Sequence, residues 1–149
     1  MNSDFAIGLH IVGFLTARQG QPLTSETLAD TYGTSPVVVR RVLSRLQQAG
    51  LIETRRGTGG GSVLAQKPSA INLRQVYEAV TDNPQFLRRH PGEEGGVAPI
   101  LGAYINELCS QAELALLEQL ESVTVKQMDA AVRPRIIASH CRTKPKSKK

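Results

Sequence analysis

The chain has 149 residues, a hydrophobic content of 40% and a formal net charge of +5 at pH 7. This length fits one domain, alone or with an extension, and the sequence lacks the run of about 18 apolar residues that a membrane-spanning helix needs. Two cysteines, Cys109 and Cys141, exclude a disulfide framework, and no positively charged segment precedes an apolar stretch near the N-terminus, so we expect a cytoplasmic protein without membrane association.

The positive charge is unevenly distributed along the chain. Residues 142–149 hold five basic side chains and no acidic one, which equals the net charge of the whole protein. Between residues 34 and 67 there are six basic side chains, and Glu53 is the only acidic one. Positive charge concentrated on one module is typical of a nucleic-acid-binding surface. We expect residues 135–149 to be a disordered basic tail that either adds nonspecific phosphate affinity or serves solubility alone.

A first helix is predicted over about residues 5–18, with Ser3 or Asp4 as its N-cap. Its apolar side chains occupy most of the helix circumference: Phe5, Ile7, Leu9, Ile11, Val12, Phe14 and Leu15. A helix that is apolar on nearly all sides is normally buried. We expect part of it to cover the neighbouring helices and part of it to meet a second subunit.

Two further helices are predicted on either side of a tight turn. The first spans about residues 25–32, where Thr24 can cap the N-terminus and Gly33 can end the helix. The second begins at Ser35-Pro36, a favourable N-cap followed by a favourable first residue, and stops at Gly50. Two short helices linked in this way form the helix-turn-helix pattern.

The second of these helices has two distinct sides. Apolar residues at helical spacing predict its buried side: Val39, Val42, Leu43 and Leu46. The opposite side has no carboxylate and carries Val37, Arg41, Ser44 and Gln48. Arg40 and Arg45 flank it. Such a helix can enter the DNA major groove, where arginine bonds guanine through two hydrogen bonds and a small apolar group contacts the thymine methyl. A solvated helix surface is the alternative.

A glycine-rich hairpin is predicted next, from two short runs that flank the sequence Gly57-Thr58-Gly59-Gly60-Gly61. This sequence lacks the lysine of a phosphate-binding P-loop, and Ser62 stands where a dinucleotide-binding fingerprint needs its last glycine. A flexible turn is one interpretation. We favour the wing of a winged helix, in which backbone N–H groups and Arg55 or Arg56 reach phosphates or the minor groove.

A short helix with Asn72 as its N-cap is predicted after the hairpin, and Asn83-Pro84 stops it. Its inward side chains are Leu73, Val76, Tyr77 and Val80. Residues 83–98 are rich in glycine, proline and charge, which predicts a flexible loop.

The residues from Pro99 to about Glu121 predict a long helix with an apolar stripe. The stripe consists of Leu101, Tyr104, Ile105, Leu108, Ala112, Ala115, Leu116 and Leu120. A small winged helix cannot cover this much apolar surface, so we expect two copies of the helix to pack together in a homodimer. Packing back onto its own domain is the alternative. A last short helix is predicted from Thr124 to just before Pro134.

Several segments, in this order, resemble the Rrf-type family of bacterial winged-helix regulators, which includes the IscR, NsrR and CymR groups. The segments are Phe5-Ala6-Ile7-Gly8-Leu9-His10, Ser35-Pro36-Val37-Val38-Val39-Arg40-Arg41-Val42-Leu43, Ala49-Gly50-Leu51-Ile52, Arg56-Gly57-Thr58-Gly59-Gly60-Gly61, and residues 71–80. The resemblance extends over residues 1–133 and is greatest to the YwnA-like branch. It implies dimerisation through the long helix, with base contacts early in the second helix of the helix-turn-helix and at the wing arginine.

The resemblance also bears on cofactors. Iron–sulfur members of the family carry three cysteines between the fourth helix and the long helix, whereas residues 86–101 contain none here. Because cysteine thiolates normally hold such clusters, we expect neither a cluster nor another cofactor or metal. Cys109 is either a thiol sensor at the dimer interface or a packing residue. We expect any effector at residues 85–96 or in the groove between the short and long helices.

These observations predict a mainly α fold with a small β-hairpin. Residues 1–82 form a winged helix-turn-helix, 83–98 a flexible loop, 99–134 a dimerisation helix with a short terminal helix, and 135–149 a basic tail. We expect a homodimeric, sequence-specific regulator of transcription, acting as a repressor on a near-palindromic operator in double-stranded DNA. No catalytic constellation indicates an enzyme. The alternative is a winged-helix module that binds a protein and does not read DNA sequence.

Two sets of site residues follow from this interpretation. The residues predicted to contact DNA are Thr24, Ser25, Ser35, Val37, Val38, Arg40, Arg41, Ser44, Arg55, Arg56, Gly57, Thr58 and Gly59. The residues predicted to form the dimer interface are Phe5, Leu101, Tyr104, Ile105, Leu108, Ala112 and Leu116. Arg41 is the first candidate for a base contact, and Arg56 is the wing residue expected in or beside the minor groove.

Overall fold

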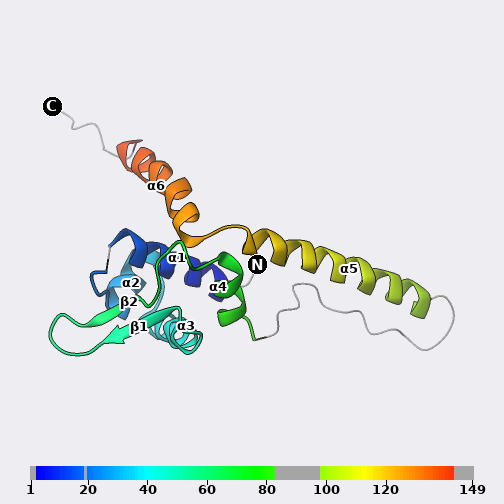
Figure 1. Ribbon diagram of the computed structural model, residues 1–149, viewed down its shortest axis with the longest axis horizontal. Coiled ribbons are helices and arrows are strands. Elements are labelled where there is room, and N and C mark those ends of the chain that lie inside the picture. Colours follow the sequence, from blue (N-terminus) through cyan, green and yellow to red (C-terminus); the bar gives the residue numbers. More distant parts are fainter. Residues whose placement is uncertain (1–2, 19, 83–97, 143–149) are drawn as a thin grey trace.

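The computed structural model describes residues 3–18, 20–82 and 98–142, with the backbone alone at residue 98 and over 136–142 (Figure 1). These residues form α1 (Ser3–Ala17), α2 (Ser25–Tyr32), α3 (Pro36–Gln48), β1 (Ile52–Arg55), β2 (Gly61–Leu64), α4 (Leu73–Val80), α5 (Ala98–Glu121) and α6 (Val125–Arg142). The predicted mainly α fold with a small β-hairpin is therefore confirmed. No helix in the described part of the chain combines the length and apolar character needed to cross a membrane.

Helix α1 forms the centre of the body and packs against α2, α3, α4, α6 and β2. It contributes to the core Ile7, Ile11, Val12 and Leu15, each at most 4% exposed. The inner sides of α3 and α4 complete this core with Val39, Val42, Leu46, Val76 and Val80, each at most 1% exposed. The buried sides predicted for α3 and α4 are confirmed, except that Leu73 is half-buried. In α1, the predicted Phe5, Leu9 and Phe14 are also half-buried.

The hairpin is hydrogen-bonded to the segment that precedes α2. β1 and β2 pair antiparallel, in a register that runs from Ile52↔Leu64 to Arg55↔Gly61. The N–H of Leu23 donates to the Ser62 carbonyl at 3.0 Å, and the N–H of Ser62 donates to the Leu23 carbonyl at 2.8 Å. Gly61 permits this approach, because a Cβ at this position would lie 2.6 Å from the Leu23 carbonyl oxygen. The wing is thereby held at a fixed position beside the helix-turn-helix.

The helix caps predicted for α2, α3 and α4 are present. Thr24 Oγ1 accepts from the N–H of Thr27 at 3.2 Å, and Ser35 Oγ accepts from the N–H of Val38 at 3.4 Å. Asn72 forms a reciprocal capping box with Gln75, with both hydrogen bonds 2.9 Å long. Gly33 ends α2 in the left-handed conformation, with φ of 76°. Each N-cap contributes about 1 kcal/mol to its helix.

The start of α1 differs from the prediction. Ser3 and Asp4 lie inside the helix instead of at its N-cap. Asp4 is 8% exposed, and its carboxylate accepts a hydrogen bond from Arg41 of α3 at 2.7 Å. The carboxylate is thus used between helices, which a local capping rule does not anticipate.

Helix α5 projects from the body, and within the described residues its extensive packing is against α4 (Figure 1). It begins at Ala98 and ends at Glu121, so the predicted bounds agree to within one residue. The rest of the predicted loop, residues 83–97, lies outside the described residues.

The last helix is longer than predicted. α6 continues through Pro134 to Arg142, although Pro134 supplies no N–H to the helix. The predicted end before Pro134 is therefore wrong, and residues 135–142 of the predicted tail are helical. The first turn of α6 belongs to the core, because Val125 is fully buried and its N–H donates to the Ile71 carbonyl at 2.8 Å.

Candidate nucleic-acid interface

The exposed side of α3 consists of the residues that the sequence predicted there. Val37 is 70% exposed, and the side chains of Arg40 and Arg41 are 58% and 55% exposed. Ser44 is exposed as well, whereas Val38 is half-buried. Because the opposite side of α3 is anchored in the core, these side chains form a surface open to a partner.

Arg40 is held by the first turn of α2. Its Nε donates to Ser25 Oγ at 3.1 Å, and its Nη2 donates to Glu26 Oε1 at 2.5 Å. This hydrogen bond from Arg40 is the main reason why the pKa of Glu26 falls to about 2, so the carboxylate is charged at neutral pH. The structure thus brings two predicted DNA-binding residues, Ser25 and Arg40, into direct contact.

The other two arginines of α3 pair with groups that are distant in the sequence. Arg41 donates to Asp4 of α1, and that carboxylate also lies 3.7 Å from Arg45 Nη1. Arg45 donates to the Val80 carbonyl at 2.8 Å and to Asp82 Oδ2 at 2.7 Å. Arg45 therefore ties α3 to the end of α4, whereas Arg41 ties it to the start of α1.

These contacts correct the expectation that Glu53 would be the only acidic residue near the basic face. Asp4, Glu26 and Asp82 reach it from α1, α2 and the segment after α4. All three lie outside residues 34–67, so the charge count of that segment did not include them. One signal was available, because Asp4 is an acidic residue at the start of an otherwise apolar helix.

The wing carries an exposed basic tip. The predicted tip residues are all exposed: Arg55, Arg56, Gly57, Thr58 and Gly59. Gly57 and Gly59 adopt positive φ angles of 99° and 76°, which glycine adopts at little steric cost. Arg55 forms a long ion pair with Glu53 at 3.6 Å. The Arg56 side chain forms no hydrogen bond or ion pair with the described residues, so it can bind an external anion.

A polar groove of about 380 Å³ lies between the helix-turn-helix and the hairpin. Four predicted DNA-binding residues line it together: Thr24, Ser25, Arg40 and Ser44. Thr54 Oγ1 donates to Gln47 Oε1 at 3.0 Å, which joins β1 to the end of α3. Val37, Arg41 and the wing tip lie outside the lining, and Ser35 acts as the N-cap of α3.

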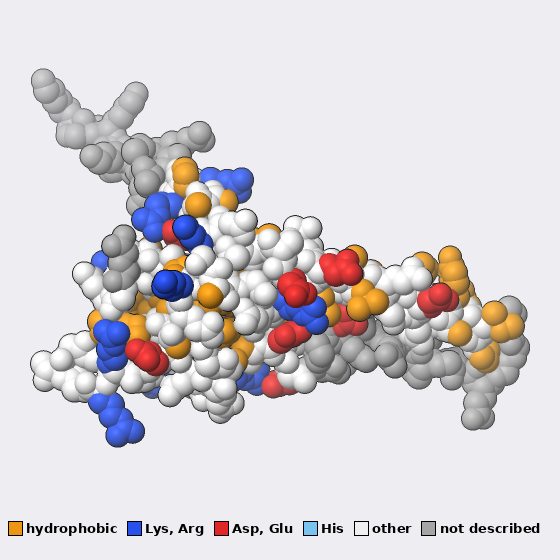
Figure 2. Space-filling view, viewed as in Figure 1, with side chains coloured by type: hydrophobic (Ala, Val, Ile, Leu, Met, Phe, Trp, Pro, Cys, Tyr) orange, Lys and Arg blue, Asp and Glu red, His pale blue; other side chains and the backbone are white. Residues whose placement is uncertain are grey.

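Most of the predicted dimer residues are exposed on α5. The exposed fractions are 58% for Leu101, 59% for Tyr104, 38% for Ile105 and 47% for Leu108, and Ala112 is also exposed whereas Leu116 is half-buried. Figure 2 shows hydrophobic side chains at the surface along the outer part of α5. Phe5 differs, because its ring stacks edge-to-face on Tyr77 of α4 with the centroids 5.2 Å apart.

The donor set of the chain does not fit an iron–sulfur cluster. Such clusters are normally held by cysteine thiolates, and the chain has two cysteines, neither of them between residues 86 and 101. Cys109 is half-buried on α5, and Cys141 belongs to α6, which leaves the body in a different direction (Figure 1). Within the described residues, no group of three or more His, Cys, Asp or Glu side chains could hold a metal ion.

Comparison with known proteins identifies relatives over most of the chain. The model of the Rrf2 family, described as an iron-dependent transcriptional regulator, matches residues 1–131. YwnA of Bacillus subtilis, named as an HTH-type transcriptional regulator, is 30% identical over 130 residues, which cover 86% of this chain and 96% of YwnA. The HTH-type transcriptional regulator NsrR of the same species is 29% identical over 123 residues, which cover 80% of this chain and 83% of NsrR.

Solved structures share the fold. CymR, the global cysteine regulator of B. subtilis, superposes with a TM-score of 0.69 at 23% identity, over 88% of this chain and 96% of CymR. A protein from Lactobacillus plantarum gives a TM-score of 0.73 at 18% identity, over 97% of this chain and 100% of its own. The sequence relatives named above are transcriptional regulators and not enzymes.

Proposed function

The chain belongs to the Rrf2 family of transcriptional regulators, and from this premise we propose that it is a homodimeric repressor that reads a near-palindromic operator. Family membership makes it a DNA-binding regulator of transcription. The dimer, the repressor role, the operator and the contact residues are the proposal. A cytoplasmic location, expected from the sequence, stays a prediction.

One observation carries the proposal: α3 and the hairpin line the same polar groove, and both carry exposed arginines. An exposed helix of this size fits the DNA major groove, and the hairpin beside it can follow the backbone towards the adjacent minor groove. The unpaired Arg56 is the side chain best suited to a phosphate or a narrow minor groove. Ser25 and Thr24 lie at the N-terminus of α2, where a backbone phosphate can bind.

Arg41 is the proposed base-reading residue of α3. Its guanidinium binds Asp4 through one nitrogen in the unbound protein, while its side chain remains 55% exposed. A guanine base can therefore bind beside Asp4 or replace it, and two hydrogen bonds to guanine are worth about 1–3 kcal/mol of discrimination. Val37, 70% exposed one turn earlier, supplies an apolar contact for a thymine methyl group.

The exposed apolar side chains of α5 support the homodimer. Leu101, Tyr104 and Leu108 lie along one side of the helix and are about half exposed or more. A second copy of α5 offers the same apolar surface, so a symmetric contact would cover both. A dimer would also place two recognition helices at the spacing that a two-fold operator requires.

The signal sensed by the regulator is proposed to be something other than an iron–sulfur cluster. The family model is described as iron-dependent, but the two cysteines of this chain lie on diverging helices and are fewer than the three that the iron–sulfur members of the family carry. The predicted effector region at residues 85–96 lies outside the described residues, and the groove predicted between α4 and α5 stays a prediction.

Selection of bound sequences from a random duplex library, repeated at two salt concentrations, tests the proposal. We expect an inverted repeat with half-sites about 34 Å apart, which is one helical turn. Arg41→Ala should lose about 1–3 kcal/mol and relax the preference at one position of each half-site. Arg135→Gln, an exposed arginine on α6, serves as the charge-matched control and should retain the wild-type pattern.

Two results would contradict the proposal at different levels. If Arg41→Ala kept the wild-type sequence preference, Arg41 would not read bases. The proposal of a sequence-specific regulator would still stand. Recovery of no enriched sequence, with binding that vanishes at moderate salt, would contradict sequence-specific recognition.

A protein-binding winged helix is the second candidate. The observation that favours it is that Arg40, Arg41 and Arg45 are each already paired with a carboxylate. Affinity for DNA that falls steeply with salt would argue against this candidate, because neutralised phosphates release counterions in proportion to the contacts made.

A further inference from the structure

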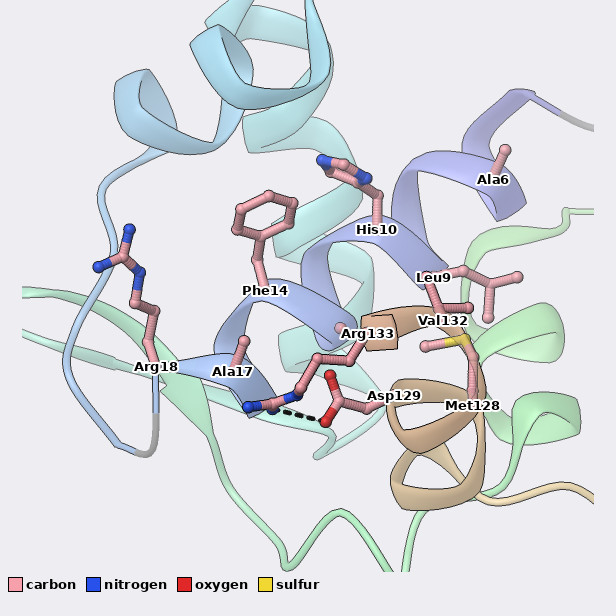
Figure 3. A pocket seen from close by; sticks show the side chains of 11 residues that line it. Ala6, Leu9, His10, Phe14, Ala17, Arg18, Met128, Asp129, Val132 and Arg133 are labelled. Atoms are coloured by element: carbon pink, nitrogen blue, oxygen red, sulfur yellow. Dashed lines mark hydrogen bonds and ion pairs between the residues drawn. The ribbon is translucent and has the colours of Figure 1, made fainter. Parts of the chain in front are cut away.

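A groove with a volume of about 510 Å³ runs between α1 and α6 (Figure 3). Pockets for small molecules typically measure about 300–1,000 Å³. None of the residues proposed above to contact DNA, and none of the residues proposed for the dimer, lines it. The groove therefore lies outside the two sets of site residues proposed for DNA and for the dimer.

The walls of the groove are mainly apolar. Leu9 and Phe14 come from α1, and Met128 and Val132 come from α6. Figure 3 shows these four side chains along the length of the groove, with Ala6 near one end. A pocket of this kind favours the apolar body of a ligand.

Gly13 is a notable part of the lining, because nothing in the fold requires a glycine there. Gly8, on the same helix, is in a tighter position, since a Cβ would lie 3.2 Å from Val76 Cγ1 and 3.4 Å from Val80 Cγ1. A Cβ at Gly13 would make one ordinary contact, 3.5 Å from Met128 Cε, and its φ angle is not positive. Glycine in a helix interior is destabilising relative to alanine, so its presence here is explained best by the space that it leaves open.

Positive charge lies at the other end of the groove. Figure 3 shows Arg18 and Arg133 towards Ala17, opposite the end marked by Ala6. Arg133 is paired with Asp129 at 2.6 Å, whereas the Arg18 side chain has no hydrogen bond or ion pair with the described residues. Burial lowers the pKa of His10, which also lines the groove, so this imidazole is neutral at pH 7 and adds no second unpaired cation.

We propose that the groove between α1 and α6 binds an amphipathic organic anion, a carboxylate attached to an apolar chain or ring. The apolar body would lie against Leu9, Phe14, Met128 and Val132, over Gly13. The carboxylate would be bound by Arg18, whose guanidinium fits a carboxylate through two parallel hydrogen bonds. Such a ligand matches both the apolar walls and the cation of Arg18, which has no ionic partner among the residues that the structure describes.

The position of the groove suggests how the ligand would act on DNA binding, a step that rests on the proposed function. The His10 ring contacts Phe14 in a tilted arrangement and Tyr32, the last residue of α2, edge-to-face, with ring centroids 4.5 Å and 4.7 Å apart. The same helix α1 holds Arg41 through Asp4. A ligand that binds one arrangement of α1 more tightly than another would therefore shift the equilibrium between two positions of the helix-turn-helix. The ratio of the two affinities sets the size of this shift.

Calorimetric titration of the full chain without DNA tests the site. Octanoate, 1-octanol and octylammonium serve as probes, because they share an apolar chain and differ in charge. We expect octanoate to bind about tenfold more tightly than 1-octanol, and octylammonium not to bind. Arg18→Gln should remove that tenfold preference, while the control Arg135→Gln should retain it.

Two substitutions at Gly13 separate the site from a structural effect. Gly13→Leu should abolish octanoate binding by filling the groove. Gly13→Ala should raise the melting temperature of the free protein and yet weaken octanoate binding, because alanine favours the helix and narrows the groove. A purely structural glycine would show loss of stability in both variants.

Three results would overturn the proposal: no binding of octanoate, equal binding of octanoate and 1-octanol, or binding that Gly13→Leu leaves unchanged. The last result would place the probe elsewhere, for example on the exposed apolar side of α5. If octanoate binds in the groove but saturating octanoate leaves the Kd for operator DNA unchanged, the ligand site stands. The proposed effect of the ligand on DNA binding is then wrong. Because the first measurement contains no DNA, failure of the proposed function would not alter it.

Discussion

Helices α1 and α5 are both rich in apolar residues, yet they are buried to very different extents. In α1, Ile11 and Val12 are at most 1% exposed. In α5, Ile100 is 71% exposed, and Leu114 is 61% exposed. The two helices differ chiefly in their neighbours, because α1 is packed on several sides whereas α5 packs extensively against α4 within the described residues.

The comparison teaches that apolar composition predicts the need for a partner and does not say where that partner is. Burying one large aliphatic side chain is worth about 1.5–3 kcal/mol, so an exposed helix of this composition gains strongly from any apolar surface that covers it. For α1 that surface is supplied by the same chain. For α5 we propose that it is supplied by a second copy.

The largest expected effect lies in the core. Ile11→Ala removes a fully buried side chain and should lower the free energy of unfolding by about 2–5 kcal/mol, through lost burial and the cavity left behind. Chemical denaturation measures the change. Leu101→Ala, a comparable truncation on α5, is the matched variant, and its cost should depend on protein concentration. If both variants lost the same stability at every concentration, the contrast between the two helices would be wrong.

The next effect concerns assembly. Tyr104→Glu combined with Leu108→Glu places two charges on the exposed apolar side of α5 and should weaken the dimer by about a thousandfold, since each of the two interface anchors contributes about 2 kcal/mol. Sedimentation analysis measures the dissociation constant.

Ser110→Glu is the control for this pair of substitutions. Ser110 is an exposed polar residue of α5, so the added charge should leave the dimer unchanged. A wild-type dimer in the Tyr104/Leu108 variant would show that another surface joins the two copies.

A smaller effect is expected at the start of α1. Asp4→Asn keeps the shape of the side chain and removes the charge that binds Arg41 and Arg45. Loss of these charge-assisted contacts in a mostly buried position should cost about 1–3 kcal/mol of stability, measured by chemical denaturation. Ser3→Ala, at the exposed neighbouring position, should change little. Unchanged stability in Asp4→Asn would mean that the ion pairs merely offset the cost of burying the carboxylate.

The smallest effect concerns the exposed pair between Glu26 and Arg40. The pKa of Glu26 is lowered from 4.5 to about 2, so its contribution to stability is present above about pH 4.5 and is lost as the pH falls towards 2. Comparison of wild type with Glu26→Gln over this pH range should show a small difference that disappears at the acidic end. If the stability difference between the two proteins grew as the pH fell, the ionised form of Glu26 would not stabilise the fold, and this prediction would be wrong.

The candidate site was predictable where its signals are local. Thr24, Ser35 and Asn72 cap their helices, and Gly33 ends α2, because each rule depends on residues within one turn of the chain. The exposed side of α3 follows from helical spacing in the same way, and the glycine run predicts the hairpin. The family model that matches residues 1–131, together with the relative at 30% identity, confirms the family that these local motifs indicated.

Contacts between distant residues were decided by the tertiary structure. The sequence gives no measure of the distance between Asp4 and Arg41, which are 37 positions apart, so capping was predicted where an ion pair exists. Pro134 is a helix breaker by local rules, yet α6 continues through it. The groove between α1 and α6 likewise depends on how two helices far apart in the sequence pack together. Local preferences determined most elements of this protein, whereas the tertiary structure decided how far α6 extends, which charges are paired and where the groove lies.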